Sequence, residues 1–308
     1  MTALRRHVVA VVAALFALAV GIAIGGGPLS YVPDDGPSSA TTPDEDVPDV
    51  EEPDGADDFS AAFVASVAPA LYDDRLLGHP VAVLALPGAD QDVVDDVVAQ
   101  VAVAGGGLTG VFDLEDDVTD LGEASLVDSL GSQLMTRLST ELDDNRVDPL
   151  ASTYVRFGQL VALAISTQDQ GGVRADEAAE SVRSTLATAD LVTSPDGARL
   201  APLVVAVLPP HDADDESLLA TAGVFRGLVV GLSDNPAGLV LLGDEASGRS
   251  GILAALREDD ELTSLVTTVD GADTGIGQVT AMLAVIRSLD SSVGSYGASG
   301  SDGPVPVP

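Results

Sequence analysis

Few side chains in this sequence of 308 residues could bind a transition metal or act as nucleophiles. The chain contains no Cys, which excludes thiolate metal sites, thiol nucleophiles and disulfides. Copper(I) prefers soft sulfur ligands, and the only methionines after the initiator are Met135 and Met282. Each lies among apolar residues at helical spacing, so we expect both to pack in the core. The sequence therefore offers no set of soft ligands.

Imidazoles and carboxylates remain as candidate metal ligands. His79 stands just before one predicted strand, and His211 stands after another with Asp212 beside it. In a parallel sheet these positions lie at opposite ends of the strands, so we do not expect the two histidines to share a site. Asp212 and the acidic residues after it could bind a hard cation weakly, but capping the next helix is their simpler role.

A Gly-rich loop precedes the last predicted helix and reads DGADTGIGQ over residues 270–278. Backbone N–H groups at a helix start can hold an anion, but Asp270 and Asp273 would oppose a phosphate. We expect Asp273 or Thr274 to cap the helix instead. The sequence contains no Gly-x-Ser-x-Gly elbow, no P-loop and no His-Glu-x-x-His motif. We therefore predict that the chain is not an enzyme, and no cofactor is evident.

The elements that must position these residues alternate between short apolar strands and amphipathic helices. Strands that are apolar on both faces and alternate with helices are typical of a three-layer, doubly wound α/β domain with a mainly parallel sheet. A turn at 194–197 also predicts a small hairpin between 191–193 and 199–200. The predicted strands are 80–86, 108–114, 203–208, 239–242 and 265–269, and the main helices follow Asp90 and cover 123–138, 152–166, 176–189, 218–232, 250–257 and 277–289.

The N-terminus carries the longest apolar run, Val8–Ile24, which has no charged or polar side chain. A helix of this run alone is about 26 Å long, and one extended through residues 25–29 is about 33 Å long, enough to cross a bilayer. A cleaved signal peptide usually has a shorter apolar region, so we predict that this helix is retained as a membrane anchor with its N-terminus in the cytoplasm. The residues that define this predicted anchor are Arg5, Arg6, Val8, Leu15, Phe16, Gly21 and Gly25.

Gly21 and Gly25 form a small-xxx-small pair that would let two anchors pack closely. The predicted organisation is an anchor over 1–29, an acidic Pro-rich disordered linker over 30–58, an exported α/β domain over 59–290 and a disordered tail over 291–308. Homo-oligomers that assemble through the anchor are one expected arrangement. The predicted location is the cell membrane or envelope, with the domain outside the cytoplasm.

The charge balance is strongly acidic, with 49 Asp and Glu against 13 basic residues, all of them Arg, and a net charge of −36. Such a surface repels phosphate backbones, which excludes nucleic acid as a partner. The acids could capture divalent cations, but they are spread over the whole chain, which favours a role in solubility, for instance in a salty habitat.

Both ends of the chain carry recognisable motifs. The opening LRRHVVAVVAALFALAVGIAIGGG, the late segment VTTVDGADTGIGQVTAMLAV and Ser295-Tyr296-Gly297 resemble the actinobacterial copper transport proteins of the MctB type. The residues of the late loop that carry this resemblance are Asp270, Asp273, Gly275, Gly277 and Gln278. The resemblance implies a channel or transporter of the cell envelope that supports copper efflux or homeostasis, with copper as the transported ion. The alternative is a signal-anchored, extracytoplasmic α/β binding or scaffold module without transport activity.

Overall fold

The computed structural model describes residues 62, 64, 66–120, 122–138, 147–195, 199–211 and 218–306. The predicted anchor over 8–24, with Arg5, Arg6, Gly21 and Gly25, and the predicted linker over 30–58 lie outside the described residues. In the described part of the chain, no helix combines the length and the apolar character needed to cross a membrane.

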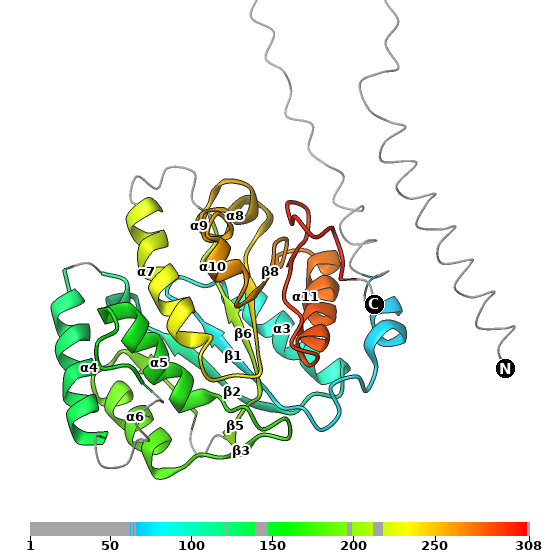
Figure 1. Ribbon diagram of the computed structural model, residues 1–308. Coiled ribbons are helices and arrows are strands. Elements are labelled where there is room, and N and C mark those ends of the chain that lie inside the picture. Colours follow the sequence, from blue (N-terminus) through cyan, green and yellow to red (C-terminus); the bar gives the residue numbers. More distant parts are fainter. Residues whose placement is uncertain are drawn as a thin grey trace, which may run out of the picture. The chain divides into compact units, whose positions relative to one another are not determined.

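A seven-stranded sheet forms the centre of the domain (Figure 1). Its order is β4-β2-β1-β6-β7-β8-β9, and every neighbouring pair is parallel except β2 and β4. Two further strands, β3 (Val173–Arg174) and β5 (Arg199–Leu200), form a separate antiparallel pair. The strands of the main sheet are β1 (Val81–Ala85), β2 (Leu108–Leu114), β4 (Val192–Thr193), β6 (Leu203–Val207), β7 (Gly238–Leu242), β8 (Thr267–Val269) and β9 (Ser295–Tyr296).

The strand order defines a doubly wound sheet. The chain passes from β1 to β2 on one side and then returns to place β6, β7 and β8 in sequence on the other side. The direction of winding therefore reverses between β1 and β6, which pair in register from Val81 with Leu203 to Ala85 with Val207. All residues of these two central strands are buried, as their continuous apolar sequences predict.

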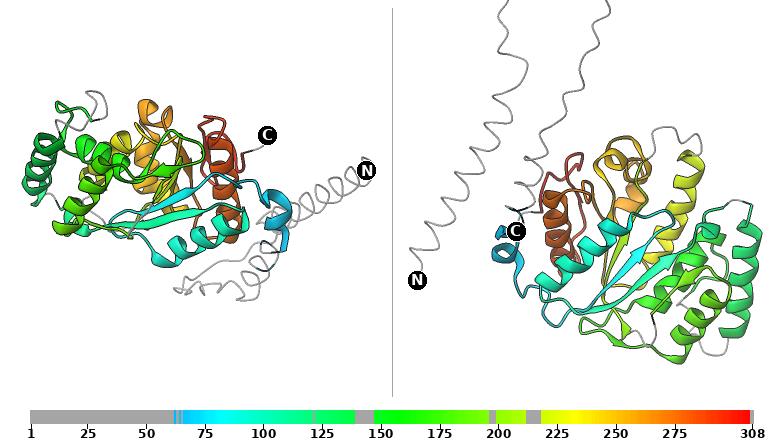
Figure 2. Two further views of the ribbon diagram at one scale, coloured as in Figure 1. Left: turned by 90° about the horizontal axis from the view of Figure 1, so that it is seen from below. Right: turned by 180° about the vertical axis from the view of Figure 1, so that it is seen from behind.

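Helices cover both faces of the sheet, which gives the predicted three layers (Figure 2). On one face, Val81 and Val83 pack in a cluster with α3 (Gln91–Val103) and α11 (Gly275–Ser288). On the other face, Ala82 and Leu84 belong to a cluster formed with the remaining main helices. These are α4 (Ala124–Leu138), α5 (Thr153–Ile165), α6 (Glu177–Thr188), α7 (Leu218–Leu232) and α9 (Ile252–Arg257).

Helices α5 and α7 approach each other closely through glycine. A Cβ atom at Gly158 would lie 2.2 Å from the carbonyl oxygen of Leu228, and one at Gly231 would lie 2.0 Å from that of Val155. No side chain larger than hydrogen fits at either position. This close packing explains why α5, apolar on most of its surface, lies inside the domain with residues 156–165 buried.

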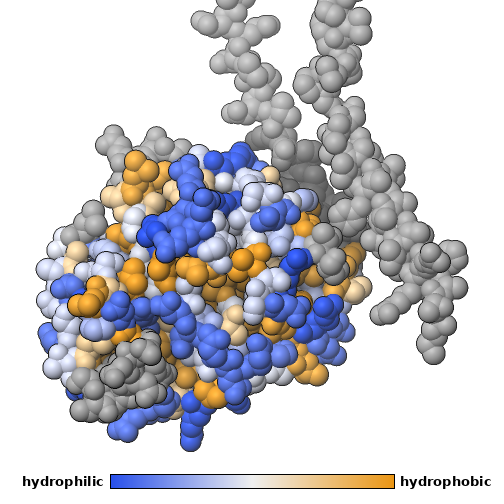
Figure 3. All heavy atoms as spheres, in the orientation of Figure 1, coloured by the Kyte–Doolittle hydropathy of each residue, from blue (hydrophilic) through white to orange (hydrophobic). Residues whose placement is uncertain are grey.

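Three shorter helices are η2 (Asp116–Val118), α8 (Glu245–Ser250) and α10 (Asp260–Thr263), and residues 66–72, before β1, are also helical. On the face of the domain drawn in Figure 3, hydrophilic and apolar side chains are mixed. Among the described residues, Leu150 and Leu219 are the most exposed large apolar side chains, at 92% and 83%. The two belong to a turn and to the first turn of α7, so they do not define one patch.

Two local predictions were wrong. The segments 191–193 and 199–200 do not pair as a hairpin, because β4 joins β2 in the main sheet and β5 joins β3. The tail over 291–308 was predicted to be disordered, but β9 extends the main sheet and Tyr296 is buried. The Gly-, Ser- and Pro-rich composition of the tail predicted disorder. The tail is nevertheless held in place by polar contacts with Arg257 and Asp270, which lie far from it in the sequence.

Candidate functional site at the carboxyl edge of the sheet

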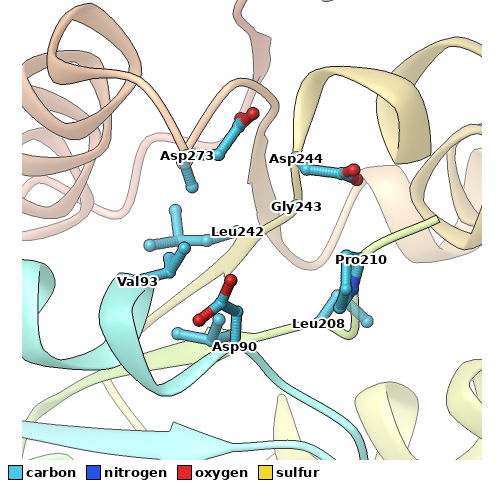
Figure 4. Close-up of a pocket in the computed structure, with 10 residues that line it drawn as sticks. Asp90, Val93, Leu208, Pro210, Leu242, Gly243, Asp244 and Asp273 are labelled. Atoms are coloured by element: carbon cyan, nitrogen blue, oxygen red, sulfur yellow. The ribbon is translucent and has the colours of Figure 1, made fainter.

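A cavity of about 190 Å³ opens where the strands β6, β7 and β8 end, next to the start of α3 (Figure 4). This is the edge at which the winding of the sheet reverses between β1 and β6. Ligands of open α/β sheets bind in the crevice outside the carboxyl ends of the strands at such a reversal. The apolar part of the lining is Val93, Val207, Leu208, Pro210, Leu242 and Ala272.

Three carboxylates stand around this cavity, and each accepts backbone hydrogen bonds at a helix start. Asp90 caps α3 by accepting from the N–H of Asp92 at 2.9 Å, which confirms its predicted role. Asp244 caps α8 by accepting from Ser247 at 2.8 Å, and Asp273 accepts from the N–H of Glu245 at 3.3 Å. In Figure 4 the Asp90 carboxylate points into the space beside Val93 and Leu242, whereas the carboxylates of Asp244 and Asp273 point away from this space.

A second cavity of about 270 Å³ adjoins the first, and the two share Pro210 in their linings. Its walls are mostly apolar, with two hydroxyls and one imidazole. The lining consists of Pro87, Thr119, Pro209, Pro210, His211, Leu218, Thr221, Phe225 and Ile252. The carboxyl edge of the sheet therefore carries one acidic hollow and one largely apolar hollow.

The two histidines lie at opposite ends of the parallel strands, as predicted. His79 precedes β1, and its Nδ1 lies 3.1 Å from the carbonyl oxygen of Gln170. His211 follows β6, where its backbone N–H donates to both carboxylate oxygens of Asp244 at 3.3 Å. Asp212 lies outside the described residues. The structure thus brings His211 next to Asp244 and separates it from His79.

Within the described ranges, no group of three or more His, Asp and Glu residues is placed to hold a metal ion. Met282 is buried in the core beside α3, and Met135 is partly buried against the other core cluster. Both methionines therefore pack as their spacing predicts. The described residues do not fit a resident copper centre.

Asp270, in the loop that carries the family resemblance, does not line the cavity and belongs to a buried polar cluster. Its side chain has no exposed surface, and its Oδ1 lies 3.6 Å from Nη2 of Arg257. Its Oδ2 accepts hydrogen bonds from the backbone N–H, at 2.9 Å, and the hydroxyl of Ser299. Arg257 in turn donates to the carbonyl oxygen of Tyr296 at 2.7 Å. Burial lowers the pKa of Arg257, and the charge of Asp270 opposes that shift.

The rest of this loop starts α11. Thr274 is the cap, since its side chain accepts from the N–H of Gly277 at 3.1 Å. A Cβ at Gly277 would lie 1.7 Å from the carbonyl oxygen of Gly271, so glycine is needed there. Gly275 lies beside Val64, and Gln278 donates to Asp96 of α3 at 2.6 Å. Of the five loop residues, only Asp273 is among those that line the cavity.

Asp113, near the end of β2, is a further unusual acid at this edge of the sheet. Its Oδ1 is buried and has no hydrogen-bond partner. Burial raises the pKa of Asp113, a hydrogen bond with Gln91 lowers it, and the charge of Glu115 raises it further.

Sequence reasoning missed Asp113 and Asp244 as site residues and treated Asp90 only as a cap. Asp244 follows a buried strand and precedes a helix, as Asp90 does. That shared position was the available signal, because the carboxyl ends of parallel strands meet at one edge.

The strand order and the helices on both faces of the sheet define a doubly wound α/β domain, and its winding reversal carries a hollow of about 190 Å³. The family model described as "Copper transport outer membrane protein, MctB" matches residues 1–307. The chain therefore belongs to the MctB family. It is similar to the proteins named Copper transporter MctB of Mycobacterium tuberculosis and Mycobacterium bovis, with 25% identity over 314 residues that cover 96% of each chain.

Proposed function

We propose that this chain is a membrane-anchored protein of the cell envelope that supports copper efflux or homeostasis. The observation that carries the proposal is the family match over 1–307, joined by relatives named as copper transporters that align along 96% of the chain. The match includes the apolar run over 8–24 with Arg5 and Arg6 before it, which favours an anchor whose N-terminus is cytoplasmic.

Copper enters this proposal as the ion transported, not as a resident cofactor. The chain has no Cys, Met282 is buried, and the two described histidines lie at opposite ends of the strands. The proposed role of the α/β domain is therefore to support transport by binding another component. No catalytic step forms part of the proposal, because the sequence carries none of the nucleophile or metallohydrolase motifs.

The test is copper tolerance of the host with and without the gene. We expect the deletion strain to be more sensitive to copper and to accumulate more of it, and the full chain to restore both properties. A variant that lacks residues 1–29 is the control for anchoring, and we expect it not to restore tolerance. Unchanged tolerance and unchanged cell copper in the deletion strain would overturn the proposal.

Topology is tested separately by membrane fractionation and protease accessibility. We expect the full chain in the membrane fraction, with the domain open to protease added outside the cytoplasmic membrane. A soluble chain, or a domain protected in intact spheroplasts, would contradict the proposed anchor and its orientation.

A second candidate function is an extracytoplasmic binding or scaffold module without transport activity. The crevice at the winding reversal favours it, because that is where domains of this architecture bind ligands. Planar bilayer recordings separate the two candidates. Reproducible ion conductance by the purified chain supports transport, and its absence, together with unchanged copper tolerance on deletion, supports the binding module.

A further inference from the structure

We infer that the outer face of the strand pair β3–β5 is a binding site for a phosphate monoester, held between Arg174 and Arg199. This inference goes beyond the copper-related function. The strands pair antiparallel with Arg174 directly opposite Arg199, so both side chains project from the same face (Figure 1). Both arginines are exposed. The adjacent pair, Val173 and Leu200, packs with a small apolar cluster, as alternation between two faces requires.

The two positive charges lie side by side without a carboxylate between them. No ion pair joins Arg174 or Arg199 to an acidic residue in the part of the chain that the structure describes. Asp169 and Asp176, in the same stretch of sequence, accept hydrogen bonds from backbone N–H groups at 2.9 Å and 2.8 Å. Like charges directly opposite each other on paired strands are destabilising. An anion bound between the two guanidinium groups would replace this repulsion with attraction.

This concentration of positive charge stands out in a chain with 49 acidic and 13 basic residues. A third guanidinium, that of Arg183, contributes to it, because its Nη2 donates to the carbonyl oxygen of Arg199 at 3.4 Å. Elsewhere in the domain, arginines are matched with carboxylates: ion pairs are formed by Arg156, Arg226, Arg249 and Arg257. An anion would therefore be attracted to the β3–β5 face more than to the surrounding acidic surface.

The two facing guanidinium groups favour a phosphate monoester over a carboxylate. Arg199 is held in position, since its Nη2 donates to the carbonyl oxygens of Gly171 at 3.3 Å and Gly172 at 2.9 Å. A carboxylate has a single charge, and one guanidinium can already bind both of its oxygens. A phosphate monoester has a charge of about −1.5 to −2 and three acceptor oxygens, which matches two guanidinium groups on one face.

The experiment measures the binding of ethyl phosphate to the full chain in maltoside detergent micelles, from the width of the ester's phosphorus NMR line. In about 0.15 M NaCl, repulsion by distant carboxylates is screened beyond roughly 8 Å, so contacts at the site dominate. We expect saturable broadening of the line. Acetate at the same concentration as the ester should displace little of it.

Variants locate the site. Arg174→Gln and Arg199→Gln each remove one charge and should weaken binding about three- to fivefold, and the double variant should not bind. Arg174→Lys keeps the charge and should retain more binding than Arg174→Gln. The matched control is Arg249→Gln, which removes the same charge from an exposed pair on α8. We expect this control to bind as the unmodified chain does.

Thermal unfolding gives a second measurement and shows that each variant folds. Without the ester, Arg174→Gln should raise the midpoint of unfolding slightly, because it removes the repulsion across the strands. The ester should raise the midpoint of the unmodified chain but not that of the double variant. A midpoint lowered by Arg174→Gln would contradict the repulsion on which the inference rests.

Three further outcomes would overturn the inference: no saturable broadening, displacement of the ester by an equal concentration of acetate, or equal weakening by Arg249→Gln and Arg174→Gln. The second outcome would mean that the site does not select phosphate. The third would mean that the ester responds to the total charge of the chain rather than to the β3–β5 face.

Discussion

Arg257 and Asp270 show how a charged pair is kept inside this domain. Both side chains are at least nine-tenths buried, and neighbouring hydrogen-bonding groups lie around them. A charge taken from water is tolerated when an opposite charge and enough polar partners replace the water. This cluster links α9, β8 and the C-terminal segment through Thr268, Tyr296 and Ser299.

Removal of one partner of this pair should be costly. Arg257→Met leaves the Asp270 carboxylate buried without a cation, and we expect the free energy of unfolding to fall by about 3 kcal/mol. Urea denaturation of the full chain measures this change. The control is Arg249→Met, which breaks an exposed pair with Glu245 and should cost about 0.5 kcal/mol or less. Equal losses in the two variants would contradict a special role for the buried pair.

Because Tyr72 is buried, we expect the free energy of unfolding to depend on pH in the alkaline range. The residue is fully buried, and burial raises its pKa from 10.0 to about 12. At pH values between 10 and about 12, the unfolded chain loses this phenolic proton while the folded chain keeps it, so the folded state loses stability as pH rises through this range.

Because the chain has no Lys, tyrosines dominate its titration in this range. We expect Tyr72→Phe to flatten the decline of unfolding free energy between pH 10 and 12, as followed by urea denaturation at each pH. The variant also loses the hydrogen bond to Gln100 and should be somewhat less stable at neutral pH. An unchanged slope would show that Tyr72 ionises alike in both states.

At the scale of elements, helices α5 and α7 approach each other so closely that glycine is required at Gly158 and Gly231. Gly158→Ala or Gly231→Ala places a methyl group against backbone oxygen at 2.2 Å or 2.0 Å. The helices would have to separate, and we expect a loss of about 1–3 kcal/mol in unfolding free energy.

Gly223→Ala is the matched control on α7, because no atom lies within 4 Å of a Cβ placed there. Alanine favours a helix interior more than glycine does, so this variant should gain up to about 1 kcal/mol. Urea denaturation of the three variants gives opposite signs if the close approach is real. A stabilising Gly158→Ala would contradict the packing described.

Most helices and strands could be predicted from the sequence, but the partners of two short strands could not. The buried strands and amphipathic helices follow from local apolar patterns, and the caps at Asp90 and Thr274 follow from their side chains. The partners of β4 and β5 could not be predicted, because two-residue strands carry too little pattern to specify a neighbour.

For the molecule as a whole, the net charge of −36 should oppose the compact state through repulsion among its carboxylates. Salt screens such repulsion at distances beyond about 10 Å at 0.1 M. We therefore expect the midpoint of thermal unfolding to rise with NaCl between low and molar salt. Tetramethylammonium chloride is the control for specific sodium binding, and we expect it to raise the midpoint as NaCl does. A midpoint that falls with either salt would contradict net repulsion.

The candidate site belongs to this largest scale. Asp90, Asp244 and Asp273 are separated by long stretches of sequence, yet they surround one cavity because three strands of a parallel sheet end at the same edge. The separation of His79 from His211 has the same origin, and it could be predicted because it needs only the parallel direction of two strands.

The amino-acid sequence by itself determined the α/β class, the buried central strands, most helices and the family, since each rests on local pattern or on motifs within one segment. Only the tertiary structure decided the strand order, the place of β9, the burial of Asp270 with Arg257, and the cavity at the winding reversal. The physical reason is that burial along one segment repeats with the period of its helix or strand. Which distant segments meet depends on how all the apolar faces pack together.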